Sequence, residues 1–514
     1  MKQRHLLLAA LSLSVLAILV FSGGALAISQ SGEAKNMQRV GHVDLQGRSA
    51  YQPNTIVYPD GRTIAFVGTH SGDRLNPLTG LVEHNGTMII DATNPANPVE
   101  TFHIPGTGGD SQMVRMCLGS DLPNGMAGKV YLLRNFNTGY ETWDVTNIHA
   151  PVKLATLSNV RSTHKLWWEC NTGIAYMPGS FNVPAPNRWR QSQSMVIVDW
   201  SNPAAAPIYC RTFGLPGGQP SASGPVPPSL HGAISAHEHP NAAGALARGA
   251  TADDIIGNRI YAAYGVGDDG VMQILDRKKL LPTVCGGTYT GPADTPTEAD
   301  LLSAQAGILW MSPDQGGHTS MPVFGMTPSS YQNFTEFKTR DIVLLASEAT
   351  SNGCNESPHW SFIVDVTVEN SKTVPPGTRV ETNPWQGPMV LSTLWVDPRA
   401  GEKYPRGNYC TRGARFGVHS SEENFRNPLY GKLTLTAYFT GGVRVWDIRE
   451  PQGPVEVGFY VAEANANTVA PGYMTNNVEV DDRGYIFTTD RGGSGMDILQ
   501  LMGPARNIVF PSSP

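Results

Sequence analysis

The sequence predicts an all-β protein built as a single seven-bladed β-propeller, with four-stranded blades around a central channel. Three observations predict it: a strand-and-turn phrase that recurs along the chain, dense turn signals between its strands, and no rival helix-period stretch beyond the first residues. The 514 residues include 55 glycines and 39 prolines, and only 16% are charged, which excludes a disordered chain. The formal net charge of −6 argues against a nucleic-acid partner, because domains that bind nucleic acids usually carry a basic patch.

The first segment has the pattern of a secretory signal peptide over residues 1–27. Lys2 and Arg4 give it a basic start, the run 6–21 is apolar, and Ala25-Leu26-Ala27 supplies small residues for cleavage. A membrane anchor is the alternative, but 16 apolar residues fall short of the ~20 that span a bilayer. We therefore expect an exported protein, in the periplasm, at the cell surface or outside the cell, with a flexible mature start over 28–40 and no membrane span in the mature chain.

Export makes disulfides possible, and the number of cysteines is even. No two of them have CxxC spacing, which argues against a thioredoxin-like or structural zinc role. The positions of Cys117 and Cys170 on neighbouring blades favour a bridge between them, and Cys354 and Cys410 follow the same logic. If they were reduced, thiolate ligation of a metal would become an alternative. The six are Cys117, Cys170, Cys210, Cys285, Cys354 and Cys410.

The recurring phrase is an apolar strand, an aspartate and a short turn with prolines. Intervals between the seven copies are 53, 55, 77, 89, 82 and 53 residues, so the middle copies carry insertions. One copy with its neighbouring strands makes one propeller blade. We expect the propeller to occupy 41–506, with 41–45 closing the ring and a tail over 507–514. The aspartate should cap its turn through side-chain-to-backbone hydrogen bonds. The repeat positions are Asp91, Asp144, Asp199, Asp276, Asp365, Asp447 and, in the last copy, Gln500.

The phrase MVIVD at 195–199, with its continuation to a proline, resembles the repeat of the LVIVD-repeat proteins, which are exported β-propellers. Longer phrases resemble large members of that family, among them GHVDLQGRSAYQP (41–53), THKLWWECNTGIAY (163–176), RFGVHSSEENF (415–425) and TNNVEVDDRGYI (475–486). The resemblance covers nearly the whole mature chain. It implies a propeller fold and export, but no general chemistry, because fold does not imply function.

Four histidines share one register of the blade template. His164, His231, His318 and His419 open the inner strands of four consecutive predicted blades. Such residues could converge on the channel axis and hold a transition metal, with iron or copper favoured and zinc possible. Glu348, at the end of a second strand, is the candidate catalytic base or outer-sphere carboxylate, and Glu169 is a further candidate for that outer role. The alternative is that each histidine only caps a turn or bonds a backbone carbonyl.

Other polar residues near the predicted rim are candidates for substrate binding. Guanidinium groups there would favour a carboxylate or phosphate, or would pair with rim acids and hold blades together. His237 and His239 are a weaker metal candidate, for which an exposed hairpin tip is the alternative. His42 and Asp44 should orient each other on the closing strand, and Trp167-Trp168 should pack between blades. The substrate-binding candidates are His70, Arg115, Arg134, Arg415, Asn477 and Asp490.

Two classes of function follow. In the first, the protein is a metal-dependent oxidoreductase that acts on a small molecule. In the second, it is a non-catalytic propeller that binds a protein, glycan or small ligand over its channel mouth. A hydrolase that uses a rim carboxylate is a third, weaker alternative. No Walker motif, GxSxG elbow or HExxH pair occurs, so no nucleotide cofactor is expected.

Overall fold

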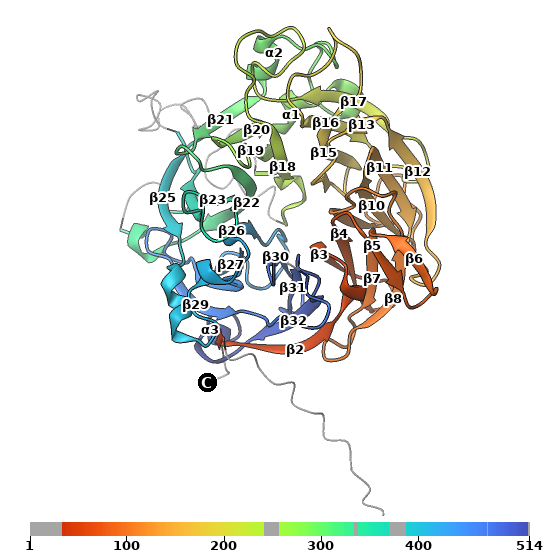
Figure 1. Cartoon of the computed structure of the whole chain (residues 1–514). Coiled ribbons are helices and arrows are strands. Elements are labelled where there is room, and N and C mark those ends of the chain that lie inside the picture. The colour runs from red at the N-terminus through yellow and green to blue at the C-terminus, as the bar shows by residue number, and fades with distance from the viewer. Residues whose placement is uncertain (1–32, 241–255, 334–337, 370–386, 470, 512–514) are drawn as a thin grey trace, which may run out of the picture.

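The computed structural model describes residues 33–240, 256–333, 338–369, 387–469 and 471–511. The expected signal peptide therefore lies outside the described residues. Small antiparallel sheets stand around a central axis, and the chain visits them in sequence order (Figure 1). This arrangement is a β-propeller, as the repeat predicts.

Five sheets each form one blade, with the first strand of each facing the axis. Each blade is antiparallel, so strands that follow one another in the sequence pair, and some of the connections carry insertions. The strands are β3 (Ala50–Val57), β4 (Thr63–Thr69), β7 (Thr87–Asp91) and β8 (Val99–Ile104); β9 (Val114–Leu118), β10 (Val130–Phe136), β11 (Gly139–Asp144) and β12 (Val152–Ser158); β13 (Val160–Arg161), β14 (Trp167–Trp168), β15 (Ile174–Phe181), β16 (Ser194–Asp199) and β17 (Ile208–Phe213); β18 (Leu230–Ser235), β19 (Arg259–Tyr264), β20 (Val271–Asp276) and β21 (Gln305–Trp310); and β22 (Gly317–Met326), β23 (Arg340–Ser347), β24 (Ser361–Asp365) and β25 (Met389–Leu394).

The remaining large sheet has nine strands in the order β1-β29-β28-β27-β30-β31-β32-β2, with β26 also pairing β27. Its two halves are joined by the single pair Phe439 and Thr475. A separate hairpin, β5 (Asp73–Asn76) and β6 (Leu81–His84), extends from the first blade. The strands of the large sheet are β1 (Ala34–Lys35), β2 (Met37–Val43), β26 (Phe416–Ser421), β27 (Leu433–Phe439), β28 (Val443–Asp447), β29 (Val455–Tyr460), β30 (Thr475–Val480), β31 (Ile486–Asp490) and β32 (Met496–Leu501).

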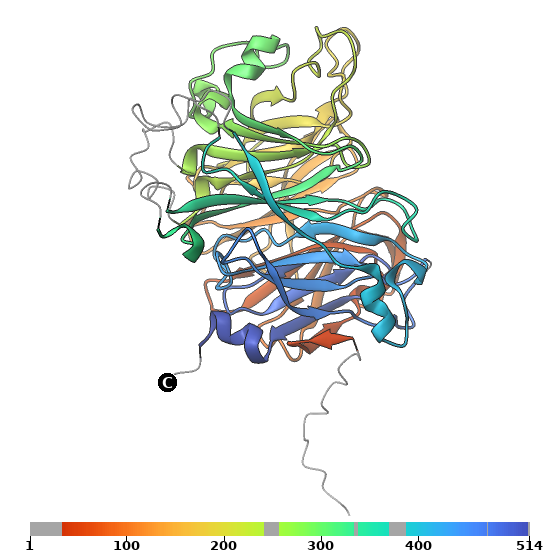
Figure 2. The ribbon, with the colours of Figure 1, turned by 90° about the vertical axis from the view of Figure 1, so that its left-hand side faces the viewer.

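The N-terminal segment closes the ring. Strand β2 pairs with β32, so that His42 lies opposite Asp497, which confirms the closure expected at 41–45. Pairing starts earlier than the expected boundary at residue 41, because β1 also pairs with β29. Helix α3 (Gly503–Val509) follows β32 and lies beside the start of β2 in both views (Figures 1 and 2). The expected end of the propeller at 506 therefore falls inside this helix.

The repeated aspartates cap turns, as predicted. Asp91 Oδ1 accepts a hydrogen bond of 3.0 Å from the backbone N–H of Thr93. Asp144, Asp199, Asp365 and Asp447 accept the same bond from the residue two positions further on. Asp276 instead caps the short helix α1 (Arg277–Leu280) in an insertion that also holds α2 (Glu298–Ser303). These carboxylates are structural.

The core lies between neighbouring sheets, where large apolar side chains are fully buried. One predicted rim residue, Arg134, lies in this core rather than in the channel. Its guanidinium pairs with Glu141 at 2.8 Å and donates to the carbonyl oxygens of Ile104 and Pro105 on the preceding blade. Its polar atoms are therefore used in holding two blades together, and its expected role in substrate binding is corrected.

All six cysteines form disulfides. Cys117–Cys170 and Cys354–Cys410 are confirmed as predicted, and Cys210–Cys285 is the third. Three disulfides are typical of an oxidising compartment reached by export. Thiolate ligation of a metal is excluded while these bonds are intact. Within the described part of the chain, no helix has the length and apolar character needed to cross a membrane.

Candidate metal centre

The four predicted histidines meet at one end of the channel. His231, His318 and His419 lie near the starts of the inner strands β18, β22 and β26, and His164 lies just before β14. Neighbouring ring centroids are 4.5 Å apart for His164 and His231, 3.9 Å for His231 and His318, and 4.3 Å for His318 and His419. The quartet forms an arc of contacting rings, because the blade geometry brings one register position of each blade to the same level of the axis.

Backbone carbonyls determine which ring nitrogens face inward. The Nδ1 atom of His231 lies 3.0 Å from the carbonyl oxygen of His318, and Nδ1 of His419 lies 2.5 Å from that of Asn476. A carbonyl oxygen only accepts hydrogen bonds, so each Nδ1 carries the proton. In a neutral ring the Nε2 atom then presents a lone pair, which is the form that binds a metal.

Burial keeps these rings neutral. It lowers the pKa of His164 to about 3, with the neighbouring Lys165 ammonium as the next cause. Burial also lowers the pKa of His231, His318 and His419 well below the usual histidine value. At neutral pH all four imidazoles are therefore neutral, and each keeps one ring nitrogen with a free lone pair.

Two contacts in the centre bring lone pairs face to face. The first is between the Nε2 atoms of His164 and His231, which lie 2.7 Å apart. The other ring nitrogen of His164, Nδ1, lies 2.5 Å from Gln112 Oε1. With Gln112 accepting from Nδ1, neither Nε2 atom has a proton to share. His419 Nε2 and Glu348 Oε1, 3.6 Å apart, are likewise both acceptors. A cation between such atoms removes their repulsion.

Glu348 belongs to the inner set of donors rather than to an outer layer. One ligand atom each from His231, His318 and Glu348 lie within 4.8 Å of one another, and all three residues are buried. The Arg415 guanidinium lies 3.1 Å from Glu348 Oε1. Burial raises the pKa of Glu348, and Arg415 opposes that rise. Sequence reasoning placed Glu348 correctly after the second strand of its blade, but not at ligand distance.

Tyr51 lies at the centre of the arc, with its ring next to those of His164 and His419. Its hydroxyl lies 3.2 Å from His318 Nε2 and 3.5 Å from His164 Nε2. Burial raises the pKa of the Tyr51 phenol well above its usual value, so it stays protonated and donates to an imidazole. The signal for it was its position at the start of the first inner strand, β3.

Two other predicted substrate residues have no free polar group for a ligand. The Nδ2 group of Asn477, on β30, donates a hydrogen bond to Gln52 Oε1 on the neighbouring strand β3. Asp490 accepts 2.7 Å hydrogen bonds from the backbone N–H groups of Met474 and Ser494, and so caps a turn. These two candidates are corrected to structural roles. His70 is buried beside Tyr51, with ring centroids 5.3 Å apart, and so stays next to the histidine centre.

The weaker metal candidates, Glu169, His237 and His239, lie away from the four histidines. Glu169 pairs with Arg277 at 2.6 Å, so it is not an outer-sphere partner of the four histidines. His239 is buried with its ring against Phe324 and Phe425, which contradicts the exposed hairpin tip. His237 Nδ1 instead meets the carbonyl oxygen of Gly257 at 2.8 Å.

Two sequence interpretations are confirmed. His42 Nε2 lies 3.0 Å from Asp44 Oδ1, as expected on the closing strand. Trp167 and Trp168 are buried between blades. Both indoles also reach a cavity at the opposite end of the channel.

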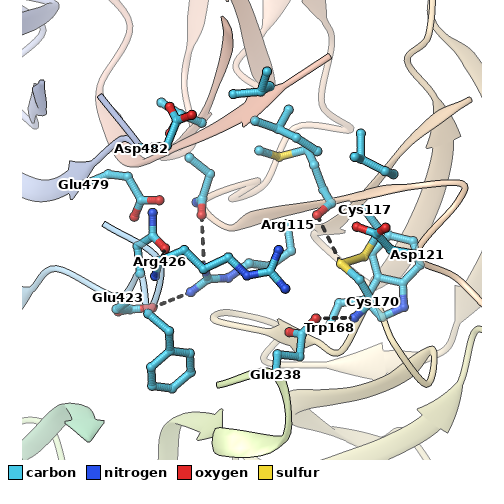
Figure 3. A pocket seen from close by; sticks show the side chains of 18 of the residues that line it. Arg115, Cys117, Asp121, Trp168, Cys170, Glu238, Glu423, Arg426, Glu479 and Asp482 are labelled. Carbon is cyan, nitrogen blue, oxygen red and sulfur yellow. Dashed lines mark hydrogen bonds and ion pairs between the residues drawn. A yellow bond between two sulfur atoms is a disulfide. The ribbon is translucent and has the colours of Figure 1, made fainter. Parts of the chain in front are cut away.

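Arg115 lies at that opposite end, not beside the histidines. It lines a cavity of about 580 Å³ together with Glu423 and the Cys117–Cys170 disulfide (Figure 3). Its guanidinium donates to Glu423 Oε2 at 2.6 Å and to Asn54 Oδ1 at 3.1 Å. The inner strands run from the histidine end toward this cavity, which places Arg115 three positions after Gln112 and Glu423 four positions after His419.

Fold and centre together define a class: a β-propeller with a candidate histidine and carboxylate metal centre on its axis. No family model matches the chain, and no curated protein matches it. Among solved structures, it is similar to the Dos1 propeller (TM-score 0.43, 10% identity, 90% of this chain and 96% of that one). It is also similar to Sqt1 from Chaetomium thermophilum (TM-score 0.44, 11% identity, 90% and 99%) and to Kuenenia stuttgartiensis hydrazine synthase (TM-score 0.44, 10% identity, 90% and 97%). Likenesses this remote do not bear on function.

Proposed function

We propose that this protein is an exported, seven-bladed LVIVD-repeat propeller that acts as a metal-dependent oxidoreductase on a small molecule. The blade count follows from treating the nine-stranded sheet as two blades, since only the pair Phe439 and Thr475 joins its halves. The seven copies of the repeat phrase support the same count. The basic and apolar start of the sequence and the three disulfides support export.

One observation carries the metal: several buried lone pairs point at one another with no proton between them. The 2.7 Å contact between Nε2 of His164 and Nε2 of His231 is the sharpest case. Neutral imidazoles held in fixed tautomers by backbone carbonyls are typical of metal ligands. Leaving such acceptors buried and unsatisfied would cost about 1–3 kcal/mol each.

The donor set favours iron. His231, His318 and Glu348 make a group of two histidines and one carboxylate, which is typical of non-haem Fe(II) sites that use dioxygen. His164 and His419 extend that set, and four imidazoles also suit copper or zinc. Such a metal would supply a site where dioxygen and substrate meet and electrons pass between them.

The chain's own residues would position the substrate and handle protons. Arg415 reaches Glu348 from the half-exposed side of the centre and would orient an anionic group of the substrate. The phenol of Tyr51 would hold the nearby imidazoles in place. The raised pKa of Glu348 would let it accept a proton when the substrate loses one.

The test is metal analysis of the purified protein by plasma mass spectrometry. We expect near-stoichiometric iron or copper in the wild type and at least a tenfold loss in His318→Ala. His84→Ala is the matched control, because His84 is exposed and pairs with Asp73 at the surface. If the folded wild-type protein holds no transition metal after growth in medium containing iron and copper, the oxidoreductase is excluded.

That result would favour the second candidate, a propeller that binds a ligand without chemistry. The cavity at the opposite channel end supports this candidate, because it is large enough for a small ligand. Catalytic turnover with dioxygen, measured by oxygen uptake in the presence of candidate substrates, would in turn exclude it.

A further inference from the structure

The cavity at the end of the channel opposite the histidines is separated from them by a layer of ion pairs. Lys165, next to His164, donates to Thr319 Oγ1 at 3.0 Å and also pairs with Glu423. Glu423 in turn pairs with Arg115 in the cavity wall. Lys165 and Glu423 are almost fully buried. The cavity is therefore a compartment of its own, and what it binds can be considered apart from the metal.

Its wall contains N–H groups without hydrogen-bond partners. Among the described residues, no partner is found for Asn54 Nδ2, Arg115 Nε or Trp167 Nε1. Asn54 and Trp167 are at least nine-tenths buried, with exposed fractions of 3% and 5%. Buried donors in a native protein normally have a partner. Three unmatched donors around one cavity point to a ligand that carries acceptor atoms.

Arg426 adds a positive charge to the same cavity. It lines the cavity and is exposed, and within the described part of the chain its guanidinium makes no ion pair. Figure 3 shows Arg426 and Arg115 both reaching into the space between Glu423 and Glu238. Arg115 also lies over the ring of Trp167, 4.3 Å from its centroid, so its side chain is held in place.

Five carboxyl groups also line the cavity: Asp121 and Asp482 are exposed to solvent, and Glu423, Glu238 and Glu479 are less exposed. Glu423 is already shared between Lys165 and Arg115. Burial raises the pKa of Glu238 to about 7, so that it is partly protonated at neutral pH, and raises that of Glu479 well above its usual value, which favours the neutral acid. Glu479 Oε2 also has no hydrogen-bond partner among the described residues, and as an acid it becomes one more donor.

We propose that this cavity binds a small organic anion rich in oxygen acceptors, a hydroxycarboxylate such as a uronic acid. Its carboxylate pairs with Arg426 at the mouth, and its hydroxyl or ring oxygens accept from Asn54, Arg115 and Trp167. The volume of about 580 Å³ lies within the range of about 300–1,000 Å³ for small-molecule sites. This proposal does not rest on the proposed oxidoreductase, because the ion-pair layer separates the two compartments.

The test is isothermal titration calorimetry at pH 6.5 with three probes of similar size: D-glucuronate, D-glucose and D-glucosamine. We expect saturable 1:1 binding of glucuronate, at least tenfold weaker binding of glucose and no binding of glucosamine. Arg426→Gln should weaken glucuronate binding about tenfold or more, because a charge-assisted, two-point contact is lost. Arg399→Gln, which alters an exposed arginine that pairs with Asp397, should leave it unchanged.

Four results of these titrations would contradict the proposed anion site. Equal affinity for glucose and glucuronate, preference for glucosamine, no effect of Arg426→Gln, or no saturation by glucuronate up to about 10 mM would each overturn the proposal. Trp167→Phe, which keeps an aromatic ring but removes the indole N–H together with part of the ring system, should weaken binding a few-fold. The titration is repeated with His318→Ala protein, so that loss of the metal and loss of anion binding are scored separately.

Discussion

The two ends of the channel bury polar atoms without partners, but of opposite kinds. At the histidine end the unmatched atoms are lone pairs, such as Nε2 of His164 and His231, 2.7 Å apart. At the cavity end they are mainly N–H donors, such as Asn54 Nδ2 and Trp167 Nε1. Lone pairs without protons call for a cation, and donors without acceptors call for an anion. One ring of strands thus carries two sites of opposite charge preference.

The difference depends on the layer between the ends. Lys165 and Glu423 come from different blades, and their pairing places a buried charge pair across the channel. A buried ion pair contributes little net stability by itself, but removing one partner is costly. Variants at this layer therefore test whether the two ends are independent.

The largest expected effect comes from Lys165→Met. The change leaves Glu423 buried with only Arg115 as a partner, and should lower the free energy of unfolding by about 3–5 kcal/mol. Urea denaturation followed by tryptophan fluorescence measures it. The double variant Lys165→Met/Glu423→Gln should recover part of the loss, because no buried carboxylate is left with a missing partner, although Arg115 then loses its ion pair.

Its control is Lys279→Met. Lys279 faces Asp276 at 3.7 Å with its side chain 55% exposed, so the cost should stay within about 0.5 kcal/mol. Equal losses in Lys165→Met and Lys279→Met would show that the central pair is solvated, and that the two ends form one compartment.

The second effect separates stability from binding at the cavity end. Replacing both Cys117 and Cys170 by alanine should cost about 2–4 kcal/mol, because the bridge closes a loop between residues 53 positions apart. The double variant should also weaken glucuronate binding, since the disulfide lines the cavity. Thermal unfolding and calorimetry measure the two effects.

Cys210 and Cys285 supply the comparison. Their bridge closes a loop between residues 75 positions apart and does not line the cavity. Replacing both by alanine should cost a similar free energy and leave binding of the anion unchanged. A loss of binding in this variant as well would mean that global loosening, rather than the cavity wall, controls affinity.

The third effect concerns the histidine end alone. Glu348→Gln removes the negative charge of the inner donor set and should weaken metal affinity about 10–100-fold. Competition with a coloured chelator measures the affinity, and Glu450→Gln, at a partly exposed glutamate that accepts hydrogen bonds from Ser329 and Ser330, serves as the control. Glucuronate binding should be the same in all three proteins. Unchanged metal affinity in Glu348→Gln would show that this carboxylate does not help to hold the metal.

The fold could be predicted because its determinants are local and repeated. Each aspartate that ends a repeat strand bonds the N–H two residues ahead or caps a short helix, so a short stretch of sequence contains the whole signal. The four histidines could be predicted for the same reason: each holds one position of the blade template, and the ring symmetry brings them together.

The remaining features depend on pairs that are distant in sequence. Lys165 and Glu423 are 258 positions apart, and no sequence motif predicts that they pair. Whether Glu348 is an inner or an outer partner of the histidines depends on a few ångströms in the distance between its carboxylate and their ring nitrogens. Arg134 lies in the core because carbonyls of the preceding blade face it. His239 is buried because aromatic rings from other blades surround it. No template of a single blade contains this information.

The smallest effect is a pH dependence of anion binding. Glu238 accepts a 2.7 Å hydrogen bond from the N–H of Cys170. Burial raises its pKa to about 7, Glu169 adds to the rise, and Arg426 and Arg115 oppose it. Below pH 7 the group is neutral, and above pH 7 its charge repels an anion in the cavity. The affinity for glucuronate should therefore fall several-fold between pH 6 and pH 8, measured by calorimetry in buffers of matched ionic strength.

Glu238→Gln holds this position neutral at every pH, so the affinity of the variant should stay flat over the same interval. Glu422 needs its own control, because burial raises its pKa to about 7 as well, while the N–H of Asn424 and the amide of Asn427 hold it lower than burial alone would. Glu422→Gln should keep the wild-type pH dependence, since Glu422 does not line the cavity. If the dependence disappears in Glu422→Gln and persists in Glu238→Gln, the charge that the anion senses lies behind the wall rather than in it.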